Sequence, residues 1–211
     1  MSDDLLAAIA RVELPTIGHE LDDGFCGPSI RPIGTVRRVV GRARTVDLRV
    51  PDATSVNEAL LSASPGEVLV IQVHSGSHAP VGAVTLAAAR AVGIVGIVVD
   101  GPITDVRALE AAAGELPVWA TGVTARTTKR LHARPRLHAP VTIGDALVSP
   151  GDIVAGDEHG VLILAPETIT IEQLEAAADS DAAEPGLLER IASGAPLDTL
   201  LARSAYREDP S

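Results

Sequence analysis

The sequence contains very few aromatic residues and only one cysteine. Aromatic side chains make up 1% of its 211 residues, whereas hydrophobic residues make up 46%. We therefore expect a core of alanine, valine, leucine and isoleucine, in a chain long enough to bury one. Because Cys26 has no partner cysteine, an internal disulfide bond and a zinc site built from cysteines are both excluded.

Positive charge and long apolar runs are also scarce. The chain has 17 lysines and arginines against 28 aspartates and glutamates, and no uninterrupted basic run exceeds the pairs Arg37-Arg38 and Lys129-Arg130. With a net charge of −11 and no aromatic platforms for bases, it is not expected to bind nucleic acid. No apolar run approaches the roughly 20 residues of a membrane helix, and the first residues lack the basic region of a signal peptide. We expect a cytoplasmic protein without a membrane partner.

Alternating apolar strands and alanine-rich helices predict a mixed α/β fold. Strands are expected at residues 39–50, 68–73, 94–99 and 117–120, and helices at 3–12, 53–62, 81–91 and 106–113. Four short strands follow, at 141–143, 146–148, 153–155 and 161–164, with turns at 150–152 and 157–160. The unit 68–99 is typical of a right-handed crossover between parallel strands. From Pro166 we expect about three helical segments, broken at 185–186 and 194–196.

Two neighbouring strand ends carry the candidate site. Strand 68–73 leads through a small-residue loop to the helix that starts near Gly82, and strand 94–99 is followed by Asp-Gly-Pro-Ile-Thr-Asp, ending at Asp105. A helix start and an acidic loop are therefore expected side by side. Anionic substrates and metal ions commonly bind at such a place.

Three sequence motifs identify a family. They are Gly-Ile-Val-Gly-Ile-Val-Val-Asp-Gly-Pro-Ile-Thr-Asp at 93–105, Leu-Pro-Val-Trp-Ala-Thr-Gly at 116–122, and Val-Ser-Pro-Gly-Asp-Ile-Val-Ala-Gly-Asp-Glu-His-Gly-Val at 148–161. Together with Gly82, they resemble the family of the regulator of ribonuclease activity A (RraA), which includes 4-hydroxy-4-methyl-2-oxoglutarate aldolases. The resemblance covers roughly residues 15–166, and its motifs are specific in combination.

The resemblance implies an α/β fold of the swivelling β/β/α type, assembled into homotrimers or paired trimers (homohexamers). We expect this domain at residues 1–166. A helical C-terminal extension, 167–211, is expected to pack on the same domain or on a neighbouring subunit.

The resemblance also implies the roles of the site residues. The backbone amides of Gly82, Ala83, Val84 and Thr85 would hold a substrate carboxylate, and Asp105 would be a catalytic residue that binds a divalent metal cation, Mg²⁺ or Mn²⁺. From the residues alone, the favoured interpretation of Asp105 is the N-cap of the helix at 106–113. For Gly82, close packing and a role in ligand binding are equal alternatives. We interpret Asp100 as a turn residue at the end of a strand.

Thr104 departs from the family pattern, because aldolase members have an arginine at this position. An arginine offers a fixed charge and a fork of donors, whereas threonine offers one neutral hydroxyl. Losing a charged partner of a buried anion costs on the order of 2–5 kcal/mol. A different substrate, a compensating arginine such as Arg107 or Arg126, or absence of catalysis would each account for this difference.

Several histidines are further candidates. His19 lies with Glu20, Asp22 and Asp23 in an irregular loop. Two interpretations of His19 are open: a catalytic proton carrier that reaches the site of a neighbouring subunit, or part of a solvated acidic loop. His74 and His78 flank the amide stretch, and residues 157–159 (Asp-Glu-His) most resemble a hairpin turn.

Two functions are therefore open. The first is a metal-dependent carbon–carbon lyase acting on a small 2-oxo acid, of the aldolase or oxaloacetate decarboxylase type, in which the metal accepts enolate charge. With no lysine near the site, a Schiff-base mechanism is not expected. The second is a non-catalytic regulatory protein that binds and inhibits a ribonuclease. A methyltransferase is not supported, because the chain lacks the glycine-rich loop and acidic ribose ligand that usually bind such a cofactor.

Overall fold

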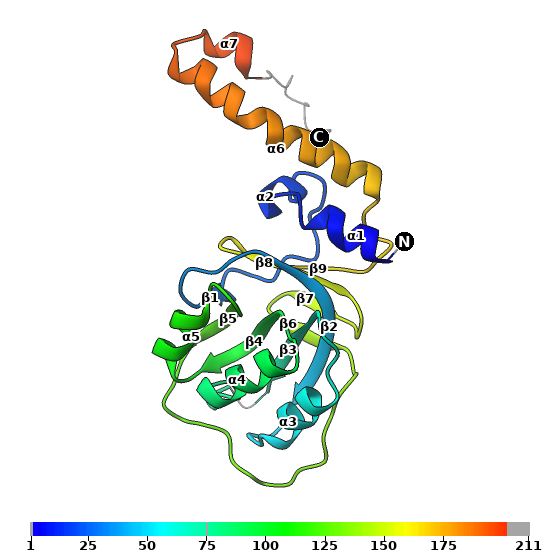
Figure 1. The fold of residues 1–211 in the computed structure, drawn as a ribbon, viewed down its shortest axis with the longest axis vertical. Coiled ribbons are helices and arrows are strands. Elements are labelled where there is room, and N and C mark those ends of the chain that lie inside the picture. The colour runs from blue at the N-terminus through cyan, green and yellow to red at the C-terminus, as the bar shows by residue number, and fades with distance from the viewer. Residues whose placement is uncertain (1, 75, 202–211) are drawn as a thin grey trace, which may run out of the picture.

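A seven-stranded sheet organises the protein (Figure 1). The computed structural model describes residues 2–74 and 76–201. The sheet has the order β1-β5-β4-β3-β2-β8-β9, and β6 and β7 form a separate hairpin. The strands are β1 (Arg31–Pro32), β2 (Val39–Leu48), β3 (Glu67–Val73), β4 (Gly96–Ile103), β5 (Val118–Val123), β6 (Val141–Ile143), β7 (Ala146–Val148), β8 (Ile153–Asp157) and β9 (Gly160–Leu164).

The four central strands are parallel. β2 pairs with β3, β3 with β4, and β4 with β5, all in the same direction, as the predicted crossover requires. β8 continues the sheet antiparallel to β2, and β9 returns beside β8. The carboxyl ends of β3 and β4 therefore lie at one edge, and the loops that leave them are neighbours.

Each face of the sheet has its own apolar layer. On one face lie α3 (Thr54–Leu61), α4 (Ala83–Ala91) and α5 (Val106–Ala112), whose Val56, Leu86 and Leu109 pack with Leu69 and Ile97 of the strands. The other face packs against the β6–β7 hairpin. There the fully buried Trp119 fills the space that small aliphatic side chains leave.

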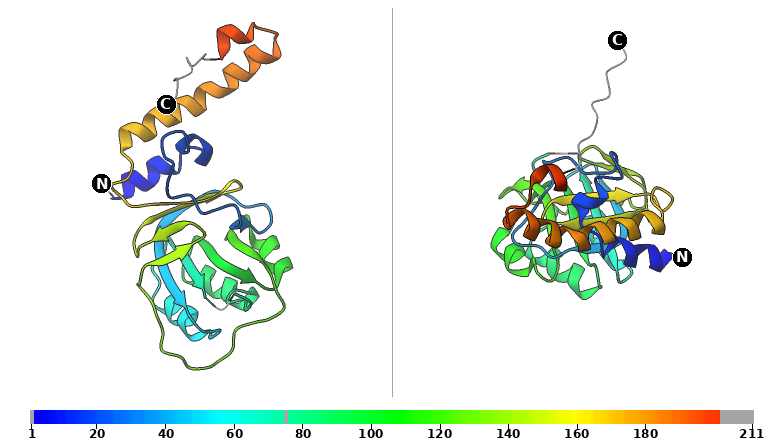
Figure 2. Two further views of the ribbon diagram at one scale, coloured as in Figure 1. Left: turned by 180° about the vertical axis from the view of Figure 1, so that it is seen from behind. Right: turned by 90° about the horizontal axis from the view of Figure 1, so that it is seen from above.

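The N- and C-terminal helices form a third layer at the β8–β9 end of the sheet. α1 (Ser2–Ile9) and α2 (Leu14–Ile17) contact the long helix α6 (Ile171–Ala192), which begins with a capping box between Thr170 and Gln173. Its Leu174 and Ala177 are buried. Beyond them α6 and α7 (Leu197–Leu200) project from the rest of the molecule, as Figure 2 shows. None of the described helices is long and apolar enough to cross a bilayer.

The predicted break at 185–186 is wrong, because α6 continues through Pro185. A proline in a helix removes one backbone donor and crowds the carbonyl four residues earlier. Here the proline is exposed on the projecting half of the helix, where water can satisfy the freed carbonyl. The second predicted break is confirmed, since Gly194 has a φ of +81° just after α6 ends.

The interpretation of Asp100 as a turn residue is also wrong. β4 runs through Asp100, Gly101 and Pro102 to Ile103, with a register shift against β5 between Val99 and Pro102. Such an irregularity lets a strand accommodate a proline, whose missing donor would otherwise break the ladder. Asp100 instead accepts a bond from the Gly144 amide at 3.3 Å, and so helps to hold the β6–β7 hairpin on the sheet.

Candidate functional site

The residues predicted to bind substrate meet at the carboxyl ends of β3 and β4. Gly82 to Thr85 form the start of α4, and Thr104 and Asp105 follow β4 directly. The two loops are joined because the Thr104 amide donates to the Val81 carbonyl at 2.9 Å. Residues more than 20 positions apart in the sequence therefore lie side by side.

The Asp105 side chain caps a different helix from the one predicted. Asp105 occupies the N-cap position of α5, but its side chain makes no capping bond there. Instead, Oδ2 accepts a hydrogen bond from the Ala83 amide of α4 at 2.9 Å. The backbone of Asp105 is left-handed, with φ 52° and ψ 40°, a conformation that aspartate adopts more readily than most residues. This conformation accompanies the turn of the carboxylate toward the neighbouring helix.

Gly82 leaves the space that this carboxylate fills. A Cβ atom at Gly82 would lie 2.6 Å from Asp105 Oδ2 and 2.8 Å from Thr104 Cγ2. Its φ of −146° is ordinary extended backbone, so the position requires glycine for room and not for conformational freedom. The close approach also places the acidic group against the first amides of a helix, where the helix dipole favours a negative charge.

An open hollow of about 470 Å³ lies beside Asp105. Its walls come from the start of α5 and the end of β5: Thr104, Asp105, Val106, Arg107, Ala108, Val123, Thr124 and Ala125. Arg107 is therefore the arginine in this wall. Arg126 bonds to the Ser77 hydroxyl at 3.3 Å, across the loop that precedes α4.

His19 lies in another part of the molecule. It follows α2 and lines a separate hollow of about 440 Å³ against α6, together with Thr16, Asp181 and Glu184. Figure 1 shows α2 and α6 beyond the end of the sheet opposite to the start of α4. One chain therefore does not bring His19 and Asp105 together.

His74 takes part in a polar cluster around Asp47. The buried Asp47 carboxylate contacts His74 Nε2 at 2.7 Å, Arg49 Nε at 2.8 Å and Arg136 Nε at 2.9 Å. Burial alone would raise the pKa of Asp47, but these donors outweigh it and hold the pKa below its usual value. His78 Nδ1 lies 3.4 Å from the Ser77 hydroxyl, in the loop that leads to α4.

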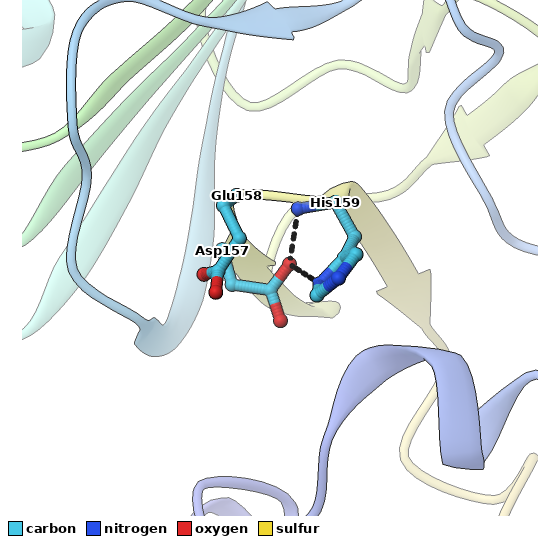
Figure 3. Close-up of side chains that lie close together, drawn as sticks. All are labelled: Asp157, Glu158 and His159. Atoms are coloured by element: carbon cyan, nitrogen blue, oxygen red, sulfur yellow. Dashed lines mark hydrogen bonds and ion pairs between the residues drawn. The ribbon is translucent and has the colours of Figure 1, made fainter.

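Asp157, Glu158 and His159 converge at the β8–β9 turn (Figure 3). One ligand atom from each of these three residues lies within 4.8 Å of the other two. No other three His, Cys, Asp or Glu residues among those described meet this condition. The Asp157 carboxylate is already engaged: Oδ1 accepts from the His159 amide at 2.8 Å, and Oδ2 pairs with Arg38 at 3.2 Å. The predicted hairpin turn is thus confirmed, and its own bonds account for the buried carboxylate.

Asp52 and Cys26 are among the buried polar groups that the sequence did not predict. Asp52 is 1% exposed and accepts the amides of Thr54, Leu131 and Ala133. Burial, with smaller effects from Asp100 and Asp145, raises the pKa of the Cys26 thiol to about 12. Thr54 is a local partner of Asp52, but Leu131 and Ala133, like the Asp100 and Asp145 that lie near Cys26, are far along the chain and are not signalled by any local pattern.

The arrangement of strands and helices defines the swivelling β/β/α domain expected from the sequence. Residues 16–163 match the RraA-like family (Aldolase/RraA). The chain belongs to this family.

Three relatives show the range of the family. A protein of Halalkalibacterium halodurans named "Putative 4-hydroxy-4-methyl-2-oxoglutarate aldolase" is 32% identical over 167 residues, which is 77% of this chain and 78% of the relative. An uncharacterized protein from Pseudomonas syringae superposes with a TM-score of 0.74, covering 94% and 96% of the two chains at 23% identity. Streptomyces coelicolor RraAS2, described as an unusual member of the RNase ES inhibitor RraA family, gives 0.66 at 26% identity, covering 90% and 96%. The family thus includes both enzymes and regulators.

Proposed function

We propose that the protein is a divalent-metal-dependent carbon–carbon lyase that acts on a small 2-oxo acid, by aldol cleavage or decarboxylation. The observation that carries the proposal is the Asp105 carboxylate, exposed at a hollow and fixed beside the first amides of α4. Membership of a family with an aldolase relative supports the same chemistry.

The geometry around Asp105 fits a divalent cation. Among the described residues, the only hydrogen bond of the Asp105 side chain is made by Oδ2, which leaves Oδ1 for a metal ion. Mg²⁺ and Mn²⁺ accept a single protein carboxylate when water and substrate complete the coordination. Such an ion would supply a Lewis acid for the 2-oxo group.

The start of α4 would orient the substrate carboxylate. Because the Ala83 amide already bonds to Asp105, the free donors are the amides of Val84 and Thr85, which have no acceptor in the first turn. Gly82 contributes room for the acidic group. Thr104 can donate one hydroxyl bond.

Arg107 would supply the positive charge that Thr104 lacks. Arg107 lines the same hollow as Asp105, two residues further along the chain. Its guanidinium can pair with a carboxylate through two parallel bonds. His19 would carry a proton only in the site of another subunit, since it is remote from Asp105 in its own chain.

The test is pyruvate release from several 2-oxo acids with added Mg²⁺ or Mn²⁺. Asp105→Asn keeps an oxygen for the Ala83 amide but removes the charge, so we expect loss of activity without loss of folding. Asp105→Ala should lose both activity and the cap. Asp179→Asn, an exposed aspartate of α6, is the matched control. If no substrate releases pyruvate, or Asp105→Asn is as active as the parent, the proposal is wrong.

A regulatory protein that inhibits a ribonuclease is the second candidate. Thr104 in place of the family arginine favours it, as does the likeness to RraAS2. Calorimetry with Mn²⁺ and oxalate separates the two functions. Joint binding that Asp105→Asn abolishes supports the lyase, whereas absence of binding supports the regulator.

A further inference from the structure

One carboxylate oxygen holds two arginines side by side. Asp47 Oδ2 accepts a hydrogen bond from Arg49 Nε at 2.8 Å and another from Arg136 Nε at 2.9 Å. The two guanidinium groups are therefore neighbours, although Arg49 follows β2 and Arg136 lies in the connection between β5 and β6. We call Arg49 and Arg136 the arginine pair.

The backbone fixes the position of the arginine pair. The connection between β5 and β6 passes around the carboxyl ends of the central strands (Figure 1) and returns beside β2. There the Asp47 amide donates to the Arg136 carbonyl at 3.0 Å, and the His138 amide donates to the Thr45 carbonyl at 3.2 Å. Asp47 itself is 5% exposed. A buried carboxylate and two backbone bonds thus determine where the arginines lie.

His74 lies on the other side of the Asp47 carboxylate. Its Nε2 is 2.7 Å from Asp47 Oδ1, and its backbone amide donates to the Leu48 carbonyl at 3.1 Å. Both oxygens of the carboxylate are therefore engaged. The three basic side chains around it come from three separate segments of the chain.

The arginine pair carries more positive charge than Asp47 neutralises. Two guanidinium groups, which are always charged, share one carboxylate. Among the described residues, no other carboxylate pairs with Arg49 or Arg136. One arginine would be enough to neutralise Asp47, and bringing a second like charge to the same oxygen costs free energy. An excess of positive charge therefore remains at this place, in a chain whose net charge is −11.

The outer donors of both arginines are available to a ligand. Each arginine bonds to Asp47 through Nε alone, and within residues 2–74 and 76–201 the Nη atoms of Arg49 and Arg136 have no acceptor. Their side chains are 58% and 51% exposed, so a ligand can reach these atoms. Because Asp47 already holds both groups in position, less side-chain freedom is lost when a ligand binds.

We propose that the arginine pair binds a phosphate group. A phosphate dianion matches the two positive charges, and it has enough oxygens to accept hydrogen bonds from both guanidinium groups at once. A carboxylate has two oxygens, which a single guanidinium satisfies. His74 would border the bound phosphate. The ligand is either inorganic phosphate or the phosphate group of a small phosphorylated molecule.

The phosphate site is separate from the one proposed for catalysis. The residues that line the hollow beside Asp105 include neither Arg49, Arg136 nor His74. Binding of phosphate by guanidinium groups needs no metal ion and no chemical step. This inference therefore does not depend on the proposed lyase activity.

Calorimetry of the full chain with inorganic phosphate tests the inference. Divalent cations are left out, so that phosphate cannot bind through a metal at Asp105, and we expect one site per chain. Arg49→Gln and Arg136→Gln should each weaken binding by about tenfold or more, because each removes one charged group of donors. Glycerol 3-phosphate distinguishes the two sources: tighter binding than inorganic phosphate identifies a phosphorylated molecule, and binding no tighter identifies the free ion.

Two control variants make the test specific. Arg134→Gln removes the same charge from an exposed position of the same connection and should bind phosphate like the parent. Asp105→Asn alters the proposed metal ligand and should also bind phosphate like the parent, which separates this inference from the proposed function. Circular dichroism will establish that each variant is folded. If Arg136→Gln does not fold, Arg49→Gln alone decides the test.

Four outcomes would overturn the inference. The first two are a parent that binds no phosphate and an Arg49→Gln variant that binds it as tightly as the parent. The third is an equal loss of binding in Arg134→Gln, which would indicate attraction by general charge. The fourth is tighter binding of malonate, a dicarboxylate, than of phosphate, which would assign the arginine pair to carboxylates.

Discussion

The Asp105 carboxylate accepts the amide hydrogen of Ala83, so a residue that follows β4 caps the helix that follows β3. The same oxygen would lie 2.6 Å from a Cβ at Gly82. The Asp105 side chain, the start of α4 and Gly82 therefore form one tightly packed unit. Changes to any of the three should affect the others.

Gly82→Ala should disturb this unit. The added methyl group overlaps Asp105 Oδ2 and Thr104 Cγ2, so the loops must separate, at a cost of about 1–3 kcal/mol in the free energy of unfolding. We also expect weaker Mn²⁺ binding by calorimetry. Gly114→Ala is the control, because no atom lies within 4 Å of its added Cβ. Equal stability and equal metal binding in the two variants would contradict this prediction.

Arg107→Gln should weaken substrate binding. Arg107 lines the hollow beside Asp105, so its loss removes the charge proposed to pair with the substrate carboxylate. We expect KM for an active 2-oxo acid to rise about tenfold. Arg126→Gln, which removes a bond to Ser77 outside that wall, should leave KM nearly unchanged. The reverse ranking of the two variants would assign the role to Arg126.

Asp52 should make the stability of the protein sensitive to acid. Burial alone would raise the pKa of Asp52, but the amides of Ala133, Leu131 and Thr54 hold it below the ordinary 3.8. A carboxyl with a depressed pKa stabilises the fold fully above 3.8, and this contribution is lost as pH falls from 3.8 through the folded-state pKa.

Urea unfolding of Asp52→Asn at several pH values measures this effect. The difference in free energy of unfolding between parent and variant should be constant near neutrality and shrink below pH 3.8. Asp179→Asn, at an exposed position, should run parallel to the parent. Parallel curves for Asp52→Asn as well would show that the amides do not favour the charged form.

Cys26 should resist thiol reagents in the folded protein. It is 8% exposed, and burial first, then Asp100 and Asp145, raises its pKa to about 12. Because only the thiolate reacts, roughly one molecule in ten thousand is reactive at pH 8. Ellman's reagent should detect the thiol in denaturant and almost none without it. Rapid labelling of the native chain would contradict the buried placement.

Local sequence patterns predicted most of the strands and helices correctly. The four short strands after Pro140 are found within two residues of the expected bounds, because turn residues separate apolar runs there. Turn residues also led to a wrong prediction, because the strand was expected to end before Gly101-Pro102, where a register shift keeps it intact. A second wrong prediction of this kind is at Pro185, inside α6. In both cases the surrounding structure decides, and the local preference does not.

The proximity of the candidate site residues was predictable from the sequence, but their contacts were not. Parallel strand order requires that Gly82 and Asp105 lie at the same edge, so their proximity follows from topology. That Asp105 caps α4 and leaves α5 without a side-chain cap depends on a left-handed backbone, which the sequence does not signal. The hydrogen bonds from the Leu131 and Ala133 amides to Asp52 likewise join residues some 80 positions apart.

Both edges of the seven-stranded sheet are protected from further strand pairing. On one side β1 has two residues, one of them Pro32, and on the other the chain at Gly24 and Cys26 exchanges backbone bonds with β9. A further strand therefore finds no long row of unsatisfied amides to extend. Among the described residues, these features disfavour the pairing of a second copy with the edges of the sheet. An assembly of copies would therefore depend on contacts between side chains, which single substitutions can strengthen or weaken.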